Sequence, residues 1–259
     1  MTHFTLEQKP GGRVFFLGDI HGNLEIVANL ISQEKFIHKK DIIVSVGDLI
    51  DRGHSSKACL ELTKQPWFHA IRGNHEQVLI DATEDAGYVH YHKNRVGGGW
   101  FYALCDEERM EMKALASALP NALTVNLLNG MRIGVTHAEC TVSRWSSFVE
   151  AITQGDDVIS HSAMWSRERM DEQDERVIEG IDLVIVGHTK SKDMQLLGNT
   201  KYIDTGRYQD PTAAQPYVDD NEATACALLA RNKAGNAEPE QCVADDQDHA
   251  AHAFEIKFN

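Results

Sequence analysis

The stretch RVFFLGDIHGNLEIVANLISQEKF, residues 13–36, combines three local patterns in one short segment. Its β-rich beginning ends in Gly-Asp, and a short polar loop follows. Leu24, Val27, Leu30 and Ile31 then recur at helical spacing behind Asn23, a residue that favours helix N-caps. The stretch therefore predicts a strand, a loop and a helix.

The same pattern occurs twice more. DIIVSVGD (41–48) leads into a helix expected near 55–64, and PWFHAIRGN (66–74) into one near 76–82. Three such units in about seventy residues imply right-handed crossovers and a largely parallel sheet, with functional groups on loops at the strand C-termini. Further on, helices are expected at 106–119 and near 146–153, and strands at MRIGVTHA (131–138), DLVIVGHT (182–189) and KYIDTG (201–206). The fold class is α/β.

Length and charge limit the classes of protein. The 259 residues are 42% hydrophobic, and we interpret them as one domain spanning 1–259. The net charge of −14 argues against a nucleic-acid partner. From Tyr208 onward, 3 Lys and Arg stand against 10 Asp and Glu, so about 207–259 is an acidic extension. Late strands are expected at ACALLA and FEIKF, with an acidic loop at 232–252 between them.

The expected cellular location is inferred from sequence features that are absent. No apolar run is long enough to cross a membrane, and the N-terminus has no signal-peptide pattern. The five cysteines are widely spaced without a CxxC pair, so neither a disulfide framework nor a sulfur-ligated metal site is indicated. We expect a cytoplasmic protein with no membrane partner.

Polar side chains follow five expected strands, at the point where each strand ends. These are GDIHG (18–22), GDLIDRG (47–53), RGNHE (72–76), THAE (136–139) and GHT (187–189). Asp19 and His21 can face one cation, and Asp48 is placed to bridge two. The second cation is then completed by Asn74, His137 and His188. A carboxylate, imidazole and amide set without thiolates suits Mn²⁺, Fe or Zn²⁺.

Each of these residues also has an ordinary structural interpretation. A lone histidine at a strand end is more often a hydrogen-bonded structural residue, and Asp beside Gly is common in turns. The joint placement on successive strands favours ligands. His90 and His92, in YVHYHKN, follow no strand, and we assign them to a solvated loop outside the site.

These motifs resemble the signature of the phosphoprotein phosphatase family within the calcineurin-like metallophosphoesterases. GGGWF (97–101), WSRER (165–169) and YIDTG (202–206) are also similar to stretches of its compact bacterial and phage type, represented by the lambda phage protein phosphatase. The similarity spans about residues 13–206; the acidic end departs from it.

The resemblance implies a β-sandwich flanked by helices. It implies two divalent metal ions, one on Asp19, His21 and Asp48 and the other on Asp48, Asn74, His137 and His188, with Mn²⁺ expected. It further implies hydrolysis of phosphomonoesters on Ser and Thr of protein substrates, with some activity on phosphotyrosine. By motif position, Arg52, Arg72 and Arg167 would hold the phosphoryl oxygens, with Arg169 as a second candidate in WSRER.

The expected hydrolysis mechanism suggests roles for His75 and Asp51. A hydroxide bridging two cations would attack in line, and a serine alkoxide is a poor leaving group that needs a proton. His75 is not needed as a ligand, so we predict it as the general acid, with Asp51 orienting its ring. For Glu76 we expect only an interaction with the amides at a helix N-terminus.

Two other functions fit parts of the pattern. A dinucleoside tetraphosphate hydrolase of the same superfamily would keep the ligands, but such enzymes typically have a neutral residue in place of Asp51 and Pro after the RG. A non-catalytic phosphoprotein-binding domain predicts gaps in the ligand set, and the sequence has none. The oligomeric state is left open by the sequence.

Overall fold

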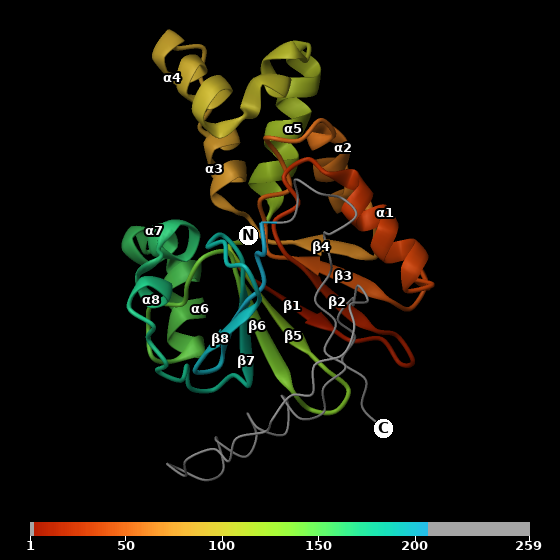
Figure 1. Ribbon diagram of the computed structural model, residues 1–259, viewed down its shortest axis with the longest axis vertical. Coiled ribbons are helices and arrows are strands. Elements are labelled where there is room, and N and C mark those ends of the chain that lie inside the picture. Colours follow the sequence, from red (N-terminus) through yellow and green to blue (C-terminus); the bar gives the residue numbers. More distant parts are fainter. Residues whose placement is uncertain (1–2, 207–259) are drawn as a thin grey trace.

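A computed structural model describes residues 3–206 of the chain (Figure 1). The expected late strands, the acidic loop and the extension from 207 onward lie outside the described residues. Two β-sheets form the centre, and helices cover their outer faces (Figure 1). This arrangement confirms the predicted mixed α/β fold with sheets flanked by helices.

The smaller sheet contains the three units predicted from the sequence. Its strands are parallel and pair in the order β2-β3-β4. Asn23 caps α1 as expected, because its side chain accepts a hydrogen bond from the backbone N–H of Glu25. The elements are β2 (Val14–Leu17), α1 (Leu24–Gln33), β3 (Ile42–Ser45), α2 (Ser56–Glu61), the 3₁₀ turn η1 (Leu62–Lys64), β4 (Phe68–Ala70) and α3 (Asn74–Ile80).

The larger sheet has six strands in the order β1-β5-β6-β7-β9-β8. It is mixed, because β5 pairs with β6 and β8 with β9 in antiparallel fashion. Three strands were not anticipated from the sequence: β1, β5 and β8. The bounds are β1 (His3–Glu7), β5 (Ala122–Asn126), β6 (Arg132–Thr136), β7 (Leu183–Val186), β8 (Gln195–Leu197) and β9 (Thr200–Tyr202).

The two sheets pack face to face, which explains their continuous apolar strands. In β2, Val14 and Phe16 point into the core between the sheets, whereas Phe15 and Leu17 point toward α1, α2 and α5. In β7, Leu183 belongs to the core between the sheets, and its neighbour Val184 to the core under α6 and α7. A strand buried on both faces needs apolar residues at every position.

The remaining helices surround this sandwich. Next to the smaller sheet, α4 (Ala86–Tyr91) projects from the molecule and continues through the π-helix η2 (His92–Val96) and the 3₁₀ helix η3 (Gly98–Ala103) into α5 (Asp106–Ala118) (Figure 1). The larger sheet carries α6 (Trp145–Gln154), α7 (Asp157–Trp165) and α8 (Glu168–Asp171). The helices expected at 106–119 and near 146–153 are confirmed.

Within residues 3–206, none of the helices has the length and apolar character that crossing a membrane demands. Cys59, Cys105 and Cys140 are free thiols. Burial raises the pKa of Cys59 and of Cys140 to about 12, so both remain protonated at neutral pH.

Candidate metal and phosphate site

The predicted ligands converge from both sheets. Asp19 and His21 follow β2, Asp48 follows β3, and Asn74 begins α3 just after β4. The larger sheet adds one histidine after β6 and one after β7. All six of these side chains are at least nine-tenths buried: Asp19, His21, Asp48, Asn74, His137 and His188.

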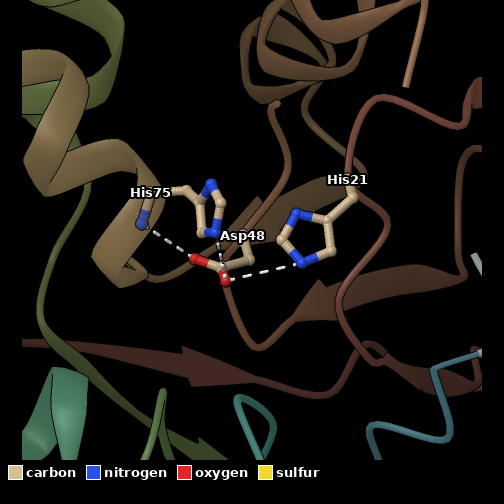
Figure 2. A group of neighbouring side chains, drawn as sticks. All are labelled: His21, Asp48 and His75. Carbon is tan, nitrogen blue, oxygen red and sulfur yellow. Dashed lines mark hydrogen bonds and ion pairs between the residues drawn. The ribbon is translucent and has the colours of Figure 1, made fainter. Parts of the chain in front are cut away.

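Asp48 stands at the centre of the group. Its Oδ2 lies 3.7 Å from Nε2 of His21 and 3.8 Å from Nε2 of His75 (Figure 2). Its Oδ1 lies 3.4 Å from Nε2 of His137 and accepts a 3.0 Å hydrogen bond from the backbone N–H of His75. One carboxylate thus faces histidines on both sides, the arrangement expected of a residue that bridges two cations.

Backbone carbonyls set the orientation of two imidazoles. Nδ1 of His21 lies 3.1 Å from the carbonyl oxygen of Ile50, and Nδ1 of His137 lies 2.7 Å from that of Val46. A carbonyl only accepts, so each Nδ1 carries the proton and each Nε2 turns toward Asp48. Metal-binding histidines are commonly held in this way.

The donor set fits divalent cations. Two groups of three place one ligand atom each within 4.8 Å of one another: His21, Asp48 and His75, and Asp48, His137 and His188. Oδ1 of Asn74 lies 2.9 Å from both Nε2 of His137 and Nδ1 of His188. Nε2 of His137 and Nδ1 of His188 thus face the same amide oxygen, as two ring nitrogens that share a cation with it would do.

Electrostatics also favour positive charge in this group. Burial together with the charges of Asp204 and Asp48 raises the pKa of Asp19 well above its usual value. Burial likewise raises the pKa of Asp204. Burial lowers the pKa of His21 and of His188 to about 3, so these rings are neutral and able to ligate.

The backbone at the site is strained. Of the seven described non-glycine residues with positive φ, five are predicted ligands or lie within four residues of one in the sequence. Position 73 also requires glycine, because a Cβ there would overlap Oδ1 of Asp48. The five residues are His21 (φ 43°), Asp48 (φ 50°), Asp51 (φ 71°), Arg52 (φ 65°) and His188 (φ 62°).

Glu76 does more than the sequence suggested. The expected contact at the N-terminus of α3 is present, because Oε2 accepts a 2.8 Å hydrogen bond from the N–H of Gly73. The same carboxylate accepts from the N–H of Asp48 at 2.9 Å and of Leu49 at 2.8 Å. It is fully buried, and burial with the charge of Asp48 raises its pKa to about 7. Glu76 ties the loop after β3 to the start of α3.

His75 has a buried carboxylate partner. Its Nδ1 lies 2.8 Å from Oδ2 of Asp51, whose Oδ1 accepts a 2.8 Å hydrogen bond from the indole N–H of Trp100. Burial opposes a charge on His75, but the charge of Asp48 and the hydrogen bond to Asp51 raise its pKa. Since Nε2 of His75 is also within reach of a cation shared with His21, the geometry permits a ligand role as well as a proton-donor role.

The assignment of His92 to a solvated loop is wrong. His92 is fully buried, its Nδ1 lies 3.1 Å from the hydroxyl of Tyr102, and its Nε2 lies 3.7 Å from Oδ2 of Asp51. The π-helical turn η2 carries the ring inward, a conformation that the apolar pattern does not reveal. His90 is exposed, as expected, but it lies in α4 and not in a loop.

The arginines divide into two sets. Arg52 and Arg167 line a hollow of about 290 Å³ together with His75, Lys190 and all the predicted ligand residues except His137. Arg72 is not among the lining residues; its guanidinium donates to Oε1 of Gln77 and to the carbonyls of Ser117 and Leu119. Arg169, the second candidate in WSRER, is buried against the carbonyl of Arg176.

Arg52 contacts the two histidines of the smaller sheet. Its Nη1 lies 2.7 Å from Nε2 of His21, and its Nη2 lies 3.1 Å from Nε2 of His75. A guanidinium only donates, so both ring nitrogens present lone pairs in this arrangement. The fork of Arg52 is thus directed at the ligand atoms, where a bound oxyanion would compete for it.

Three further residues were not identified from the sequence. Trp100 fixes Asp51, Lys190 lines the hollow, and Asp204 lies beside Asp19 with a buried, unpartnered Oδ2. Asp204 alone had a signal of the type used above, because it follows the apolar run of KYIDTG. Trp100 and Lys190 lie on no expected strand end.

Comparison with known proteins gives one family. The family model of the calcineurin-like phosphoesterases matches residues 12–191. Serine/threonine-protein phosphatase 1 of Salmonella typhimurium is 34% identical over 206 residues, covering 78% of this chain and 89% of that protein. Serine/threonine-protein phosphatase 2 of Escherichia coli is 31% identical over 199 residues, covering 74% of this chain and 87% of that protein.

Relatives of another specificity match in part. A symmetrical bis(5'-nucleosyl)-tetraphosphatase of Actinobacillus succinogenes is 35% identical over 68 residues, about a quarter of each chain. Two solved structures share the fold. One is a protein serine/threonine phosphatase from Saccharomyces cerevisiae, with a TM-score of 0.54 and 15% identity, covering 79% of this chain and 70% of that chain. The other is described as a diadenosine tetraphosphatase, with a TM-score of 0.51 and 19% identity, covering 80% of this chain and 89% of that chain.

Proposed function

The chain belongs to the calcineurin-like phosphoesterase family, and we propose that within it the protein is a metal-dependent protein serine/threonine phosphatase. The observation that carries the proposal is the buried contact of His75 with Asp51 beside the ligand groups. A seryl or threonyl alkoxide leaves poorly without a proton, whereas a phosphoanhydride releases a good leaving group. A histidine oriented by a carboxylate is therefore of most use to a phosphomonoesterase.

The metals are assigned by the donor set. We propose that Asp19, His21 and Asp48 hold one divalent cation and that Asp48, Asn74, His137 and His188 hold the other. Mn²⁺ is our first choice, with Fe and Zn²⁺ as alternatives. When bound, two such ions lower the pKa of coordinated water and neutralise charge on the phosphoryl group.

The protein's own groups perform the remaining steps. Arg52 and Arg167 would hold phosphoryl oxygens, Arg52 exchanging its imidazole contacts for them. His75 would carry a proton at Nε2 and deliver it to the leaving oxygen as the phosphorus–oxygen bond breaks. Asp51 holds the proton on Nδ1 and keeps the ring aimed at the hollow. For Arg72, whose guanidinium lies against the end of α5, we propose a structural role in place of phosphate binding.

The biological setting follows from the same reasoning. We infer that the substrates are phosphorylated proteins, and that the chain acts in the cytoplasm as one domain with residues 207–259 as an extension. The 68-residue match to a symmetrical bis(5'-nucleosyl)-tetraphosphatase supports a second candidate, hydrolysis of dinucleoside tetraphosphates. The complete ligand groups speak against a purely phosphoprotein-binding role.

One experiment separates these functions. Purified protein of measured metal content is assayed on phosphoserine, phosphothreonine and phosphotyrosine peptides and on diadenosine tetraphosphate. We expect the phosphoserine and phosphothreonine peptides to give the highest kcat/KM, with Mn²⁺ the strongest activator. A preference for diadenosine tetraphosphate would establish the second candidate instead. Bound metal without hydrolysis of any substrate would indicate a binding domain.

A further inference from the structure

A second hollow, of about 250 Å³, adjoins the metal site. Its wall includes five residues that also line the first hollow: Arg52, Asn74, His75, Arg167 and His188. The other lining residues come from α3, from the α4–η2 segment and from the end of α7: Val78, Tyr91, Arg95, Val96 and Trp165. Side chains of the α4–η2 segment and of the end of α7 thus form part of its wall.

The second hollow lies on the leaving-group side of the site. Asp19, His21 and Asp48 line only the first hollow, whereas His75 lines both. If His75 protonates the leaving oxygen, as proposed above, the chain attached to that oxygen continues into the second hollow. The inference therefore rests on the proposed function.

The charge of this hollow is opposite to that of the chain. Three arginines line it, namely Arg52, Arg95 and Arg167, and no carboxylate does so among the described residues. The chain as a whole carries −14. Arg95 is exposed, and its side chain makes no ion pair or hydrogen bond within residues 3–206. Its guanidinium is thus available to a bound anion.

The remaining walls are apolar and aromatic. Tyr91 is 43% exposed, Trp165 is half-buried, and Val78 and Val96 are buried. Such a surface contacts the backbone and aliphatic carbons of an extended peptide without selecting one side chain. Any selectivity for the side chains of the peptide would therefore come from Arg95.

We propose that this hollow binds the residues next to the phosphorylated serine or threonine, and that Arg95 selects peptides with Asp or Glu there. An exposed ion pair of this kind contributes about two- to fivefold in kcat/KM and weakens with salt. The occupant is a peptide segment, and its recognition element is a carboxylate.

The test uses three phosphoserine peptides that differ only in the flanking residues, which are Asp, Ala or Lys. The protein should hydrolyse them in the order acidic, neutral, basic, with the spread shrinking as ionic strength rises. Arg95→Glu should remove or reverse the order. Lys93→Glu is the matched control, because Lys93 has the same charge on the same π-helical turn, lines neither hollow and lies over the ring of Tyr102.

Each outcome bears on the inference. Equal kcat/KM for the three peptides would overturn it and leave the proposed function standing. A similar loss of selectivity in Arg95→Glu and Lys93→Glu would also overturn it, because general charge would then explain the order. Hydrolysis of diadenosine tetraphosphate but of none of the peptides would overturn the proposed function and this inference together.

Discussion

Nδ1 of His75 lies 2.8 Å from Oδ2 of Asp51, and both side chains are withdrawn from solvent. This contact determines which nitrogen of His75 faces the hollow, because the proton on Nδ1 is held by the carboxylate. Asp51 is itself fixed by Trp100 on its other oxygen. The ring therefore reaches the site in one orientation, with Nε2 toward Asp48 and Arg52.

His75→Asn removes the group that we expect to protonate the leaving oxygen. Turnover of a phosphoserine peptide should fall by roughly 10²–10⁴-fold, while metal content stays nearly intact. The loss should be smaller for p-nitrophenyl phosphate, whose phenolate leaves without help. Steady-state kinetics with metal analysis checks this. Loss of metal in His75→Asn would identify His75 as a ligand, which its distance to Asp48 permits.

Asp48→Asn should have the reverse pattern. The carboxylate of Asp48 is common to both groups of three ligand atoms, so its neutralisation weakens both sites at once. We expect the purified variant to lose most of its bound divalent metal, with activity falling in proportion. Elemental analysis of protein purified side by side with His75→Asn gives the comparison. Retention of two ions per chain in Asp48→Asn would contradict the bridging assignment.

Trp100→Phe tests the support of Asp51. Loss of the indole N–H leaves Oδ1 of Asp51 without this donor, and kcat should fall about tenfold with KM little changed. Trp145→Phe is the matched control, because its indole also donates at 2.9 Å to a buried partner, Thr124, but in the core under α6. The control should lower stability and leave kcat unchanged. Equal effects on kcat would mean that Trp100 acts only through folding.

Asp41→Asn tests an ion pair remote from the site, in which the carboxylate is buried and Arg13 is partly exposed. Asp41 is fully buried and accepts hydrogen bonds from the backbone and side chain of Arg13. Burial opposes its charge, but the bonds from Arg13 lower its pKa in the folded state. Its contribution is therefore complete above the unfolded pKa of about 3.9 and is lost as pH falls through the lower folded value.

We expect Asp41→Asn to lower the free energy of unfolding by about 2 kcal/mol at pH 7. The difference from the unsubstituted protein should stay constant down to about pH 5 and shrink below about pH 4. Urea unfolding across this range measures it. Glu179→Gln, which disrupts only the exposed pair with Arg144, should have little effect at any pH. A difference that grows toward acid pH would rule out the charged pair as its source.

The smaller sheet could be predicted because its signals are local. Each strand is an apolar run followed by a polar loop and a helical period, and the ends of parallel strands meet at one edge. Asp19, Asp48 and Asn74 could be grouped on that basis alone. His137 and His188 could be added because each directly follows a run buried on both faces.

What the sequence did not predict depends on distant packing. β1 pairs with β5, which is 115 or more residues away, and nothing local distinguishes HFTLE from a loop. His92 reaches Asp51 through a π-helical turn, and Trp100 reaches it through the 3₁₀ helix that follows. The direction of Arg72 is set by carbonyls at the end of α5. In each case the partner is chosen by tertiary structure.

The ligand groups come from two sheets that pack against each other through a core of apolar side chains. Asp48 belongs to one sheet and His137 to the other, and they approach to 3.4 Å at the edge of that apolar layer. Divalent ions shared by such groups would act as cross-links between the two halves of the sandwich, so ion binding and folding are thermodynamically linked. At an ion concentration one hundred times the Kd, each site would add about 2.7 kcal/mol to the free energy of unfolding. Chelation should therefore lower the melting temperature of the whole protein, and Asp48→Asn should abolish most of that sensitivity.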